Sequence, residues 1–520
     1  MARGGDRLWV AAVTALGGYL RACQIGGKGL WIDEAFSVWL GWQPVGEMLG
    51  WLVRIDQHPP LYYLLLHFWM ILGDDPSTVR ALSALCGTLT IPVVYLLGRR
   101  LAGDKVGFLT ALILAVSPFH VRFAQETRMY TLLTLNASLA LYALAWLFTD
   151  PRSAEARLGR QFVDFWRGWR TTRRRPPMWV IETDLAWLGY VLFTAAMLLT
   201  HNTAVFFPVA TNIIVLLLVR LRIANRESRI TNHGFLRNWL LAQVGVFLLW
   251  SLWLPAFAVQ GVGVYREFWL PAPTWSTVAG AVGAFVSDFL PLPPAGLCAV
   301  GVLYAGLALL GLVHFRRRPA HVLFLLVTFT TPFVGEWLVS LYRPIFYDRT
   351  LIWASLPLYL LLAAGIRQLH HRSYIIGVIL VVLVVNTLSL REYYVNFEKE
   401  QWDDAALFVA GRVEAGDLIL FNATWTQIPF DYYFRRYERS VAEHGVPVDL
   451  FDRGVLEPEM STDDLPRLRV LVRSHERVWL VYSHDWYTDP QGLIPLALEE
   501  ELDLLDRWDF YGLQVRLYGR

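Results

Sequence analysis

Long apolar stretches dominate this sequence of 520 residues and limit what it can fold into. Counting stretches of about 17 to 25 residues, the length that a helix needs to cross a bilayer, gives about eleven. They start near Leu8, Thr78, Val106, Tyr130, Asp184, Thr203, Asn238, Ala295, Val322, Thr350 and Tyr374. Only 17% of the residues are charged, against about 25% in soluble proteins. The sequence therefore predicts an all-α polytopic membrane domain with membrane lipids around it.

Basic residues alternate along the connections between these stretches. Every second connection is rich in Lys and Arg, namely residues 99–105, 152–175, 220–237, 316–318 and 367–372. Because basic loops stay in the cytoplasm, the pattern predicts a cytoplasmic amino terminus and an odd number of spans. The whole chain has 46 basic and 44 acidic residues, which gives no reason to expect a nucleic-acid partner.

The composition changes near residue 392, where the long apolar runs stop. We expect a membrane domain over residues 1–392 and a soluble, extracytoplasmic α/β domain over residues 393–520. Short apolar segments predict strands, and longer mixed segments predict helices. The expected strands are 417–421, 478–482 and 508–517, and the expected helices are 402–414 and 496–505.

The loop over residues 23–77 is too long for a simple connector and falls on the predicted outer side. Its amphipathic run 37–52 predicts helices that lie in the membrane interface. It also contains two adjacent carboxylates, Asp33 and Glu34, in the sequence GLWIDEAFS. A carboxylate at membrane depth costs about 2.5 to 3.5 kcal/mol, so acids in this setting usually serve ions, protons or polar ligands. Asp33 is then a catalytic base facing a cavity, or the pair simply caps a surface helix.

Residues 56–63, DQHPPLYY, form a second outer cluster. Two consecutive prolines stop a helix and fix the backbone, so His58 would be held at a defined angle near Asp56. A single histidine is more often structural than functional, and both interpretations stay open.

Two further clusters lie on the predicted outer side. Residues 120–130, HVRFAQETRMY, would place Arg122 and Glu126 on one face if they are helical, as an ordinary surface ion pair worth under about 1 kcal/mol. Residues 342–349, YRPIFYDR, contain Arg343 and Arg349, whose planar guanidinium groups suit phosphate oxygens. Anchoring to lipid headgroups explains these arginines equally well.

Taken in order, four of these elements resemble one known family. They are Arg21, the Gly29–Ser37 sequence GLWIDEAFS, the His58–Tyr63 sequence HPPLYY and the Ala124–Tyr130 sequence AQETRMY. The set is similar to the GT-C membrane glycosyltransferases related to protein O-mannosyltransferases and lipid A aminoarabinose transferases. The resemblance covers about 390 residues and implies a GT-C fold. It also implies inverting sugar transfer from a polyprenyl-phosphate donor to a hydroxyl group on the outer face of the membrane.

The resemblance implies roles for individual residues. Asp33 would be the base that deprotonates the acceptor, with Glu34 beside it in the site. His58, where some relatives have lysine, would contact the donor phosphate. The substrate-binding residues would also include Glu126, Arg128, Tyr130, His201 and Arg349. Thr350 follows Arg349 where the family usually has tyrosine.

Transfer from a lipid phosphate needs no nucleotide or redox centre, because a carboxylate takes the proton while cations offset the charge on the leaving phosphate. No glycine-rich phosphate loop occurs in the sequence, in agreement with a lipid-linked donor. We therefore expect no cofactor. Carboxylates alone also form sites for hard metals, so a divalent metal held by Asp33 with Glu34 or Glu126 is the alternative.

The expected acceptor is a lipid, a glycan or a protein. Two other functions stay open. A multi-pass lipid or ion transporter would have discontinuous central helices with charges near the bilayer midplane. A membrane-anchored cell-envelope assembly protein would work through its outer domain, and the Asp33 region would be dispensable.

Overall fold

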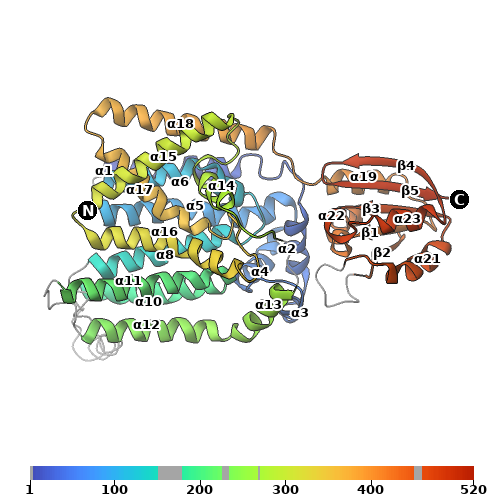
Figure 1. The fold of residues 1–520 in the computed structure, drawn as a ribbon, viewed down its shortest axis with the longest axis horizontal. Helices are drawn as coiled ribbons and strands as arrows, with labels where there is room; N and C mark the ends of the chain where they lie inside the picture. The colour runs from blue at the N-terminus through green and yellow to red at the C-terminus, as the bar shows by residue number, and fades with distance from the viewer. Residues whose placement is uncertain (1–3, 150–177, 225–232, 267–269, 450–458) are drawn as a thin grey trace.

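The computed structural model describes residues 4–149, 178–224, 233–266, 270–449 and 459–520. Long helices form one end of the elongated molecule, where the amino terminus lies, and a five-stranded sheet forms the other, with the carboxyl terminus (Figure 1). We call these the helical bundle (residues 4–395) and the C-terminal unit (residues 402–520). The predicted basic run 152–175, and part of 220–237, lie outside the described residues.

The helical bundle contains long helices and shorter, bent ones. Its first half has α1 (Gly4–Ala22), α5 (Pro76–Ala102), α6 (Asp104–Val116), α7 (Pro118–Ala124), α8 (Tyr130–Thr149) and α10 (Met178–Leu198). Its second half has η3 (Asn202–Val205), α11 (Phe206–Ala224), α12 (His233–Ser251), α13 (Leu254–Arg266), α14 (Trp275–Ser287), α15 (Pro294–Phe315), α16 (Pro319–Ser340), η4 (Ile352–Ala354), α17 (Ser355–Gln368) and α18 (Arg372–Val395).

Six of the described helical segments are long and apolar enough to cross a membrane, namely α5, α8, η3–α11, α15, α16 and α18. Two bent pairs, α6–α7 at 58° and α12–α13 at 67°, raise this number to eight if each pair is one span. The remaining predicted stretches fall on α1, α10 and the η4–α17 segment. The protein is thus a multi-pass membrane protein, whereas the predicted count of eleven spans is not confirmed.

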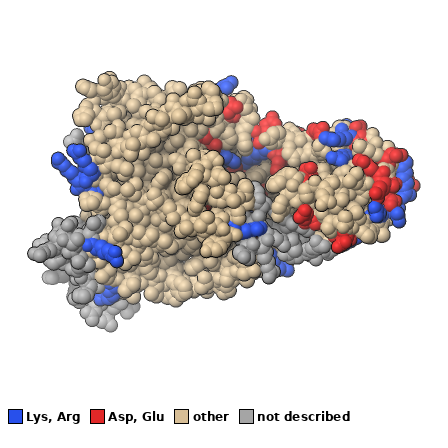
Figure 2. Space-filling view, in the orientation of Figure 1, with Lys and Arg blue, Asp and Glu red and all other residues tan. Residues whose placement is uncertain are grey.

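The surface of the helical bundle agrees with a membrane environment. Figure 2 shows a broad uncharged surface over the bundle, with Lys and Arg at the end near the amino terminus and charges of both signs on the C-terminal unit. Large apolar side chains such as Leu248, Val302 and Leu380 are exposed on it, as expected for contact with lipid. At the basic end, Arg318 donates to the carbonyl oxygen of Leu101 at 3.3 Å, so two of the predicted basic connections meet.

The bend between α6 and α7 has a local cause. Pro118 has no N–H to donate to the carbonyl of Leu114, and the Ser117 hydroxyl caps the new helix. The fully buried guanidinium of Arg21, on α1, donates instead to the carbonyl oxygens of Leu114 at 3.2 Å and Ala115 at 3.1 Å. Arg21 therefore supports the break in the helix by supplying the missing donors.

Glycines allow α15 and α17 to pack with their backbones in contact. A Cβ atom on Gly365 of α17 would overlap the carbonyl oxygen of Leu307, and one on Gly311 of α15 would overlap that of Leu361. Membrane helices often approach this closely where small residues face each other. The spacing between the two helices therefore depends on both glycines.

We predict that G365A destabilises the protein by about 1 to 3 kcal/mol, because the added methyl group forces the two helices apart. Thermal unfolding in detergent micelles measures the effect. G377A on α18 is the matched control, since a Cβ atom there has no other atom within 4 Å. Equal melting temperatures for the two variants would contradict direct backbone contact.

The long loop before α5 folds into short helices. These are α2 (Ile32–Trp42), α3 (Val45–Arg54), α4 (Leu61–Trp69) and η1 (Met70–Leu72). The prediction of helices within residues 37–52 is confirmed by α2 and α3. Figure 1 shows both at the end of the bundle that faces the C-terminal unit.

The C-terminal unit is a mixed sheet with the strand order β2-β1-β3-β5-β4. Strands β2, β1 and β3 are parallel, and β5 and β4 continue the sheet in antiparallel fashion. The strands are β1 (Leu418–Asn422), β2 (Ala442–Val446), β3 (Arg477–Tyr482), β4 (Asp503–Phe510) and β5 (Leu513–Gly519). The helices are α19 (Trp402–Ala410), η5 (Thr424–Thr426), α20 (Gln427–Phe434), η6 (Arg435–Tyr437), η7 (Thr462–Asp464), α21 (Leu465–Arg473), α22 (Asp485–Thr488) and α23 (Leu493–Glu499).

Two sequence predictions for this unit are wrong in detail. The expected helix over 496–505 ends at Glu499, and the expected single strand over 508–517 is a hairpin of β4 and β5 that turns at Gly512 (φ +83°). Pairing with β5 outweighs the helical preference of the Leu- and Glu-rich segment. The strands expected at 417–421 and 478–482 and the helix starting at Trp402 are confirmed.

Both faces of the sheet are covered. Alternate residues of a strand point to opposite faces. Ile419 and Phe421 of β1 belong to the apolar cluster that contains α19 and α20, whereas Leu418 and Leu420 belong to the cluster with α21 and α23. The face with α19 and α20 is the one that contacts the bundle. There the Tyr433 hydroxyl accepts the Leu30 N–H at 2.7 Å.

Candidate functional site

A cavity of about 800 Å³ lies where the helical bundle meets the C-terminal unit. Its bundle side is formed by residues from α2, 55–58, 128–130, 201–206, α13 and 338–350. Its other wall consists of Trp425, His484, Trp486 and Tyr487. The cavity brings together the candidates Asp33, His58, Arg128, Tyr130, His201 and Arg349, together with Asn202 and Arg343. Glu34 and Glu126 do not line it.

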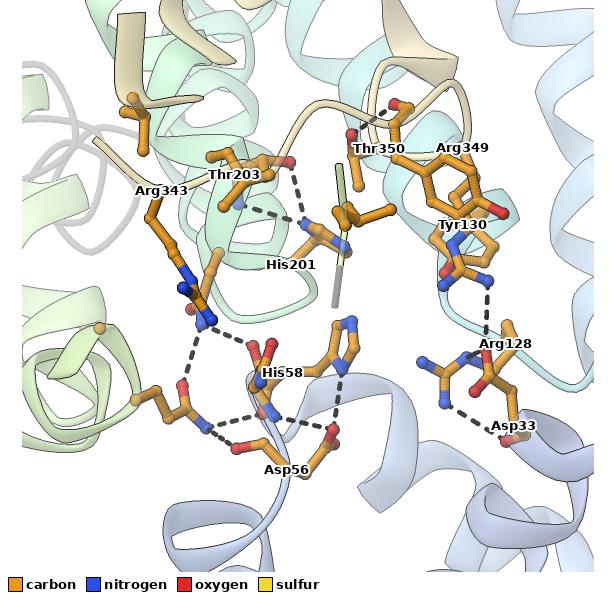
Figure 3. Close-up of a pocket in the computed structure, with 18 of the residues that line it drawn as sticks. Asp33, Asp56, His58, Arg128, Tyr130, His201, Thr203, Arg343, Arg349 and Thr350 are labelled. Carbon is orange, nitrogen blue, oxygen red and sulfur yellow. Dashed lines mark hydrogen bonds and ion pairs between the residues drawn. The ribbon is translucent and has the colours of Figure 1, made fainter. Parts of the chain in front are cut away.

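Asp33 is in the first turn of α2, and its carboxylate lies between two arginines (Figure 3). Oδ2 accepts a hydrogen bond from Nη1 of Arg349 at 3.1 Å and lies 4.0 Å from Nε of Arg128. The side chain is 28% exposed, so it can reach a ligand in the cavity. The alternative of a helix cap does not hold, because the N-cap position is Trp31.

The electrostatics keep Asp33 ionised. Burial alone would raise the pKa of its carboxyl group, but the charges of Arg128 and Arg349 outweigh this effect and hold the pKa below its usual value. The carboxylate is therefore present at neutral pH.

Arg128 is fixed in the segment between α7 and α8. Its Nη1 donates to the carbonyl oxygen of Asp33, to Oγ of Ser37 and to the hydroxyl of Tyr63, each at 3.3 Å. Only 3% of the residue is exposed. The Arg128 guanidinium is therefore a buried positive charge at the edge of the cavity.

Arg349 reaches the site from the segment between α16 and η4. Its guanidinium lies 4.4 Å from the ring centre of Tyr347 and 5.6 Å from that of Tyr130, within the range of cation–π contacts. Thr350 lies behind it and donates to Glu336 Oε2 at 2.8 Å. Aromatic rings thus position the cation beside Asp33.

His58 and His201 lie next to each other in the cavity (Figure 3). The prolines after His58 precede α4, as expected, and its Nδ1 donates to Oδ1 of Asp56 at 2.9 Å. The two imidazole rings are 5.1 Å apart, edge to face. Asp56 thereby fixes the tautomer of His58, so that Nε2 accepts in the neutral ring.

His201 is a neutral hydrogen-bond donor. Burial, together with the nearby His58 and arginines, lowers its pKa well below the usual value. Its Nδ1 accepts from the Thr203 N–H at 3.2 Å, so the proton of the neutral ring is on Nε2. Within the described part of the chain this buried Nε2 has no hydrogen-bond partner.

Glu34, also in the first turn of α2, does not line the cavity and lies in a buried ionic cluster. Its carboxylate accepts from Arg80 Nε at 2.8 Å and Nη2 at 2.7 Å, from Lys399 Nζ at 2.8 Å and from the Thr127 N–H at 2.8 Å. None of its surface is exposed. Burial would raise the pKa of Glu34, but the charges of Arg80 and Lys399 hold it at about 2.

Glu34 therefore has no free oxygen for a substrate and serves to position α2. The cluster joins α5, α2 and the segment that leads into the C-terminal unit. It contains one carboxylate and two cations, all buried. Removing the carboxylate leaves two cations without their shared partner.

We predict that E34Q lowers stability by about 3 to 5 kcal/mol, the usual cost of breaking a buried ion pair from one side. K399M is the matched control and should cost less, because Glu34 keeps both hydrogen bonds to Arg80. Thermal unfolding in detergent micelles compares the two. A melting temperature of E34Q equal to that of the unmodified protein would show that the cluster is not structural.

Glu126 is buried and does not line the cavity, whereas the sequence indicated part of a surface ion pair or a substrate-binding residue. Residues 125–129 are not helical, so α7 and α8 do not form one continuous helix with a shared face. Glu126 lies 3.6 Å from Arg122, but it is only 2% exposed, so this is no surface ion pair. Arg122 also lies 3.6 Å from Asp288. Arg122 and Asp288 are half-buried, and none of the three residues lines the cavity.

Sequence reasoning missed several residues around the site. Arg80 is a charge inside a predicted apolar stretch, and such a charge needs a buried partner, so the sequence could have indicated its pairing with an acidic residue. Gln260 of α13 donates to the carbonyl of Leu52 at 2.9 Å and lines the cavity, without any signal in the sequence. The other wall of the cavity consists of residues that follow strands β1 and β3, namely Trp425, His484, Trp486 and Tyr487. Both strands were predicted, so the residues after their carboxyl ends could have been recognised as candidates for a binding site.

No group of three or more His, Cys, Asp or Glu side chains in the described residues could hold a metal ion. The alternative metal site at Asp33 with Glu34 or Glu126 also lacks its partners. Glu34 is saturated by cations, and Glu126 lies outside the cavity.

The fold of this chain, a helical bundle followed by a small terminal unit, is that of solved GT-C membrane glycosyltransferases. This confirms the resemblance seen in the sequence. The family model described as dolichyl-phosphate-mannose-protein mannosyltransferase matches residues 57–156, about a fifth of the chain.

Solved structures match over nearly the whole chain. ArnT from Cupriavidus metallidurans in the apo state has a TM-score of 0.63 at 15% identity, covering 99% of this chain and 98% of that chain. The same protein bound to undecaprenyl phosphate gives a TM-score of 0.58 at 14% identity, with the same coverage. The archaeal oligosaccharyltransferase AglB from Archaeoglobus fulgidus, in complex with an inhibitory peptide and a dolichol-phosphate, gives 0.52 at 10% identity, covering 99% of this chain and 74% of that chain. A search of curated proteins with this sequence found no match.

Proposed function

We propose that this protein is an integral membrane glycosyltransferase that moves a sugar from a polyprenyl-phosphate donor to an acceptor hydroxyl. The observation that carries the proposal is the ionised Asp33 carboxylate, which faces an 800 Å³ cavity between Arg128 and Arg349. The likeness to ArnT, solved with undecaprenyl phosphate, and to AglB, solved with a dolichol-phosphate, supports a lipid-phosphate donor.

The side chains account for each part of the reaction. Asp33 takes the proton of the acceptor hydroxyl as its oxygen bonds to the anomeric carbon. The bond from that carbon to the donor phosphate oxygen breaks on the opposite side, which inverts the centre, and the polyprenyl phosphate leaves with the bonding electron pair. Arg349 and Arg343 line the cavity and would offset the charge on this phosphate, and His58 would lie beside it.

The donor lipid would reach the site from the bilayer. The bundle side of the cavity includes the apolar residues Phe206 of α11, Phe257 of α13 and Leu338 of α16, all on helices of the membrane bundle. An isoprenoid chain can pack against such residues while its phosphate reaches the arginines. The basic connections at the other end of the bundle favour a cytoplasmic amino terminus, so we place the cavity and the C-terminal unit on the outer face.

A transporter is the second candidate, because the bent pairs α6–α7 and α12–α13 are discontinuous helices of the kind that transporters use. The ionisable groups that line the cavity do not lie at those breaks. They lie at the helix ends next to the C-terminal unit, which favours the transferase.

We predict that D33N reduces sugar transfer by about 100- to 10,000-fold, because the amide cannot accept the proton. The assay uses purified protein in lipid nanodiscs with polyprenyl-phosphate sugars and measures release of polyprenyl phosphate. E47Q is the matched control, since Glu47 is an exposed carboxylate on α3 outside the cavity. Full transfer by D33N would remove the base assignment, and transport of the lipid without transfer would favour the second candidate.

We predict that R349Q moves the acidic limb of the pH profile of kcat/KM to higher pH. Arg349 lowers the pKa of Asp33, so its loss raises that pKa, and the base becomes protonated at a less acidic pH. R349K retains the charge and should move the limb less. A profile of R349Q that keeps the original acidic limb would show that Asp33 is not the titrating base.

A further inference from the structure

The wall of the cavity that faces Asp33 belongs to the C-terminal unit and has no role in the proposed chemistry. It consists of Trp425, His484, Trp486 and Tyr487. Trp425 follows strand β1, and the other three follow strand β3. These strands are neighbours and parallel, with Leu418 opposite Val478.

Their position in the sheet is one where α/β proteins bind ligands. Ligands of such sheets sit outside the carboxyl ends of parallel strands, because the loops there converge at one edge. In this protein the loops that follow β1 and β3 line the same cavity as Asp33. The sheet thus presents its usual binding edge to the site in the bundle.

The two loops are tied together by buried hydrogen bonds. Asn422, at the end of β1, donates to the Ser483 carbonyl at 2.9 Å and to the Thr488 hydroxyl at 3.2 Å. Ala423 and His484 both have φ of +55°, a strained conformation for residues other than glycine. Strain of this kind persists only where the surroundings impose it, so the loops have a defined shape.

The wall is also connected to the segment that carries Asp33. His484 Nε2 lies 3.6 Å from Oε1 of Glu400, and Oε2 of Glu400 accepts the Ile32 N–H at 3.2 Å and the Trp402 indole N–H at 2.7 Å. One carboxylate therefore contacts both the wall and the residue next to Asp33. Glu400 thereby connects the wall to the start of α2.

The side chains of the wall suit a carbohydrate. Aromatic faces carry partial negative charge and attract the C–H groups of sugar rings, while indole N–H and imidazole groups hydrogen-bond to hydroxyls. Trp486 is 63% exposed, so its ring is available for such stacking. The arginines that line the cavity, Arg128, Arg343 and Arg349, all come from the bundle, which leaves the phosphate on that side.

We propose that Trp425, His484, Trp486 and Tyr487 form the acceptor subsite, and that the acceptor is a carbohydrate hydroxyl. The inference rests on the proposed function, in which Asp33 deprotonates the acceptor. The bundle then holds the donor lipid phosphate, and the C-terminal unit selects the acceptor. A sugar ring stacked on this wall would lie in the same cavity as Asp33.

The test uses the full-length protein in lipid nanodiscs. Saturation-transfer NMR measures binding of methyl glycosides of glucose, galactose, mannose and N-acetylglucosamine, and a thermal shift measures binding of undecaprenyl phosphate. We expect W486A to reduce the glycoside signal at least fivefold, W486F to retain it, and both to keep the shift with undecaprenyl phosphate. W275A is the matched control, because Trp275 is 79% exposed on α14 and outside the cavity.

The outcomes separate this inference from the proposed function. A glycoside signal from W486A equal to that of the unmodified protein overturns the acceptor subsite alone. The same holds if the unmodified protein binds undecaprenyl phosphate but no glycoside. Binding of a Ser-containing peptide, lost in W486A, while no glycoside binds, also overturns the carbohydrate. Glycoside binding that depends on Trp486, in a protein that does not bind undecaprenyl phosphate, supports the subsite and overturns the proposed donor.

Discussion

The hydrogen bonds of Arg80 are the interaction on which the site depends. Its five N–H groups hold the Glu34 carboxylate and the carbonyl oxygens of Ile25, Lys28 and Gly29, so the loop before α2 and the start of that helix have one anchor. Adjacent residues of a helix point about 100° apart. When Glu34 is held toward α5, its neighbour Asp33 is directed toward the cavity. The buried charge of Arg80 thereby orients the half-buried carboxylate of Asp33.

The same anchor connects the two parts of the molecule. Lys399 joins Glu34 from the segment that leads into the C-terminal unit, and Lys28 donates to the Phe397 carbonyl at 2.7 Å close by. The stacked rings of Trp42 and Tyr432, 5.9 Å apart, extend the contact along α2. The cavity is consequently a product of docking, since its walls come from both parts and its shape follows their relative position.

Much of this was predictable, and the exceptions have physical reasons. The polytopic bundle follows from long apolar stretches, and strands β1 and β3 follow from short apolar segments. The gathering of Asp33, His58 and Arg349 follows from the ionisable clusters on the predicted outer side. Glu34 is equivalent to Asp33 in sequence, and only the rotation of α2 and the partner Arg80 separate their roles. The sequence left open whether residues 120–130 are helical, and residues 125–129 contain neither proline nor glycine to mark the break there.

The broken helix α6–α7 has a consequence for biosynthesis. The carbonyls of Leu114 and Ala115 obtain their hydrogen bonds from Arg21, which lies more than 90 residues earlier in the chain. During translation α1 leaves the ribosome well before the Pro118 break is made. The donor is therefore already synthesised when the unpaired carbonyls arrive, so the break can be satisfied as soon as α1 packs beside it.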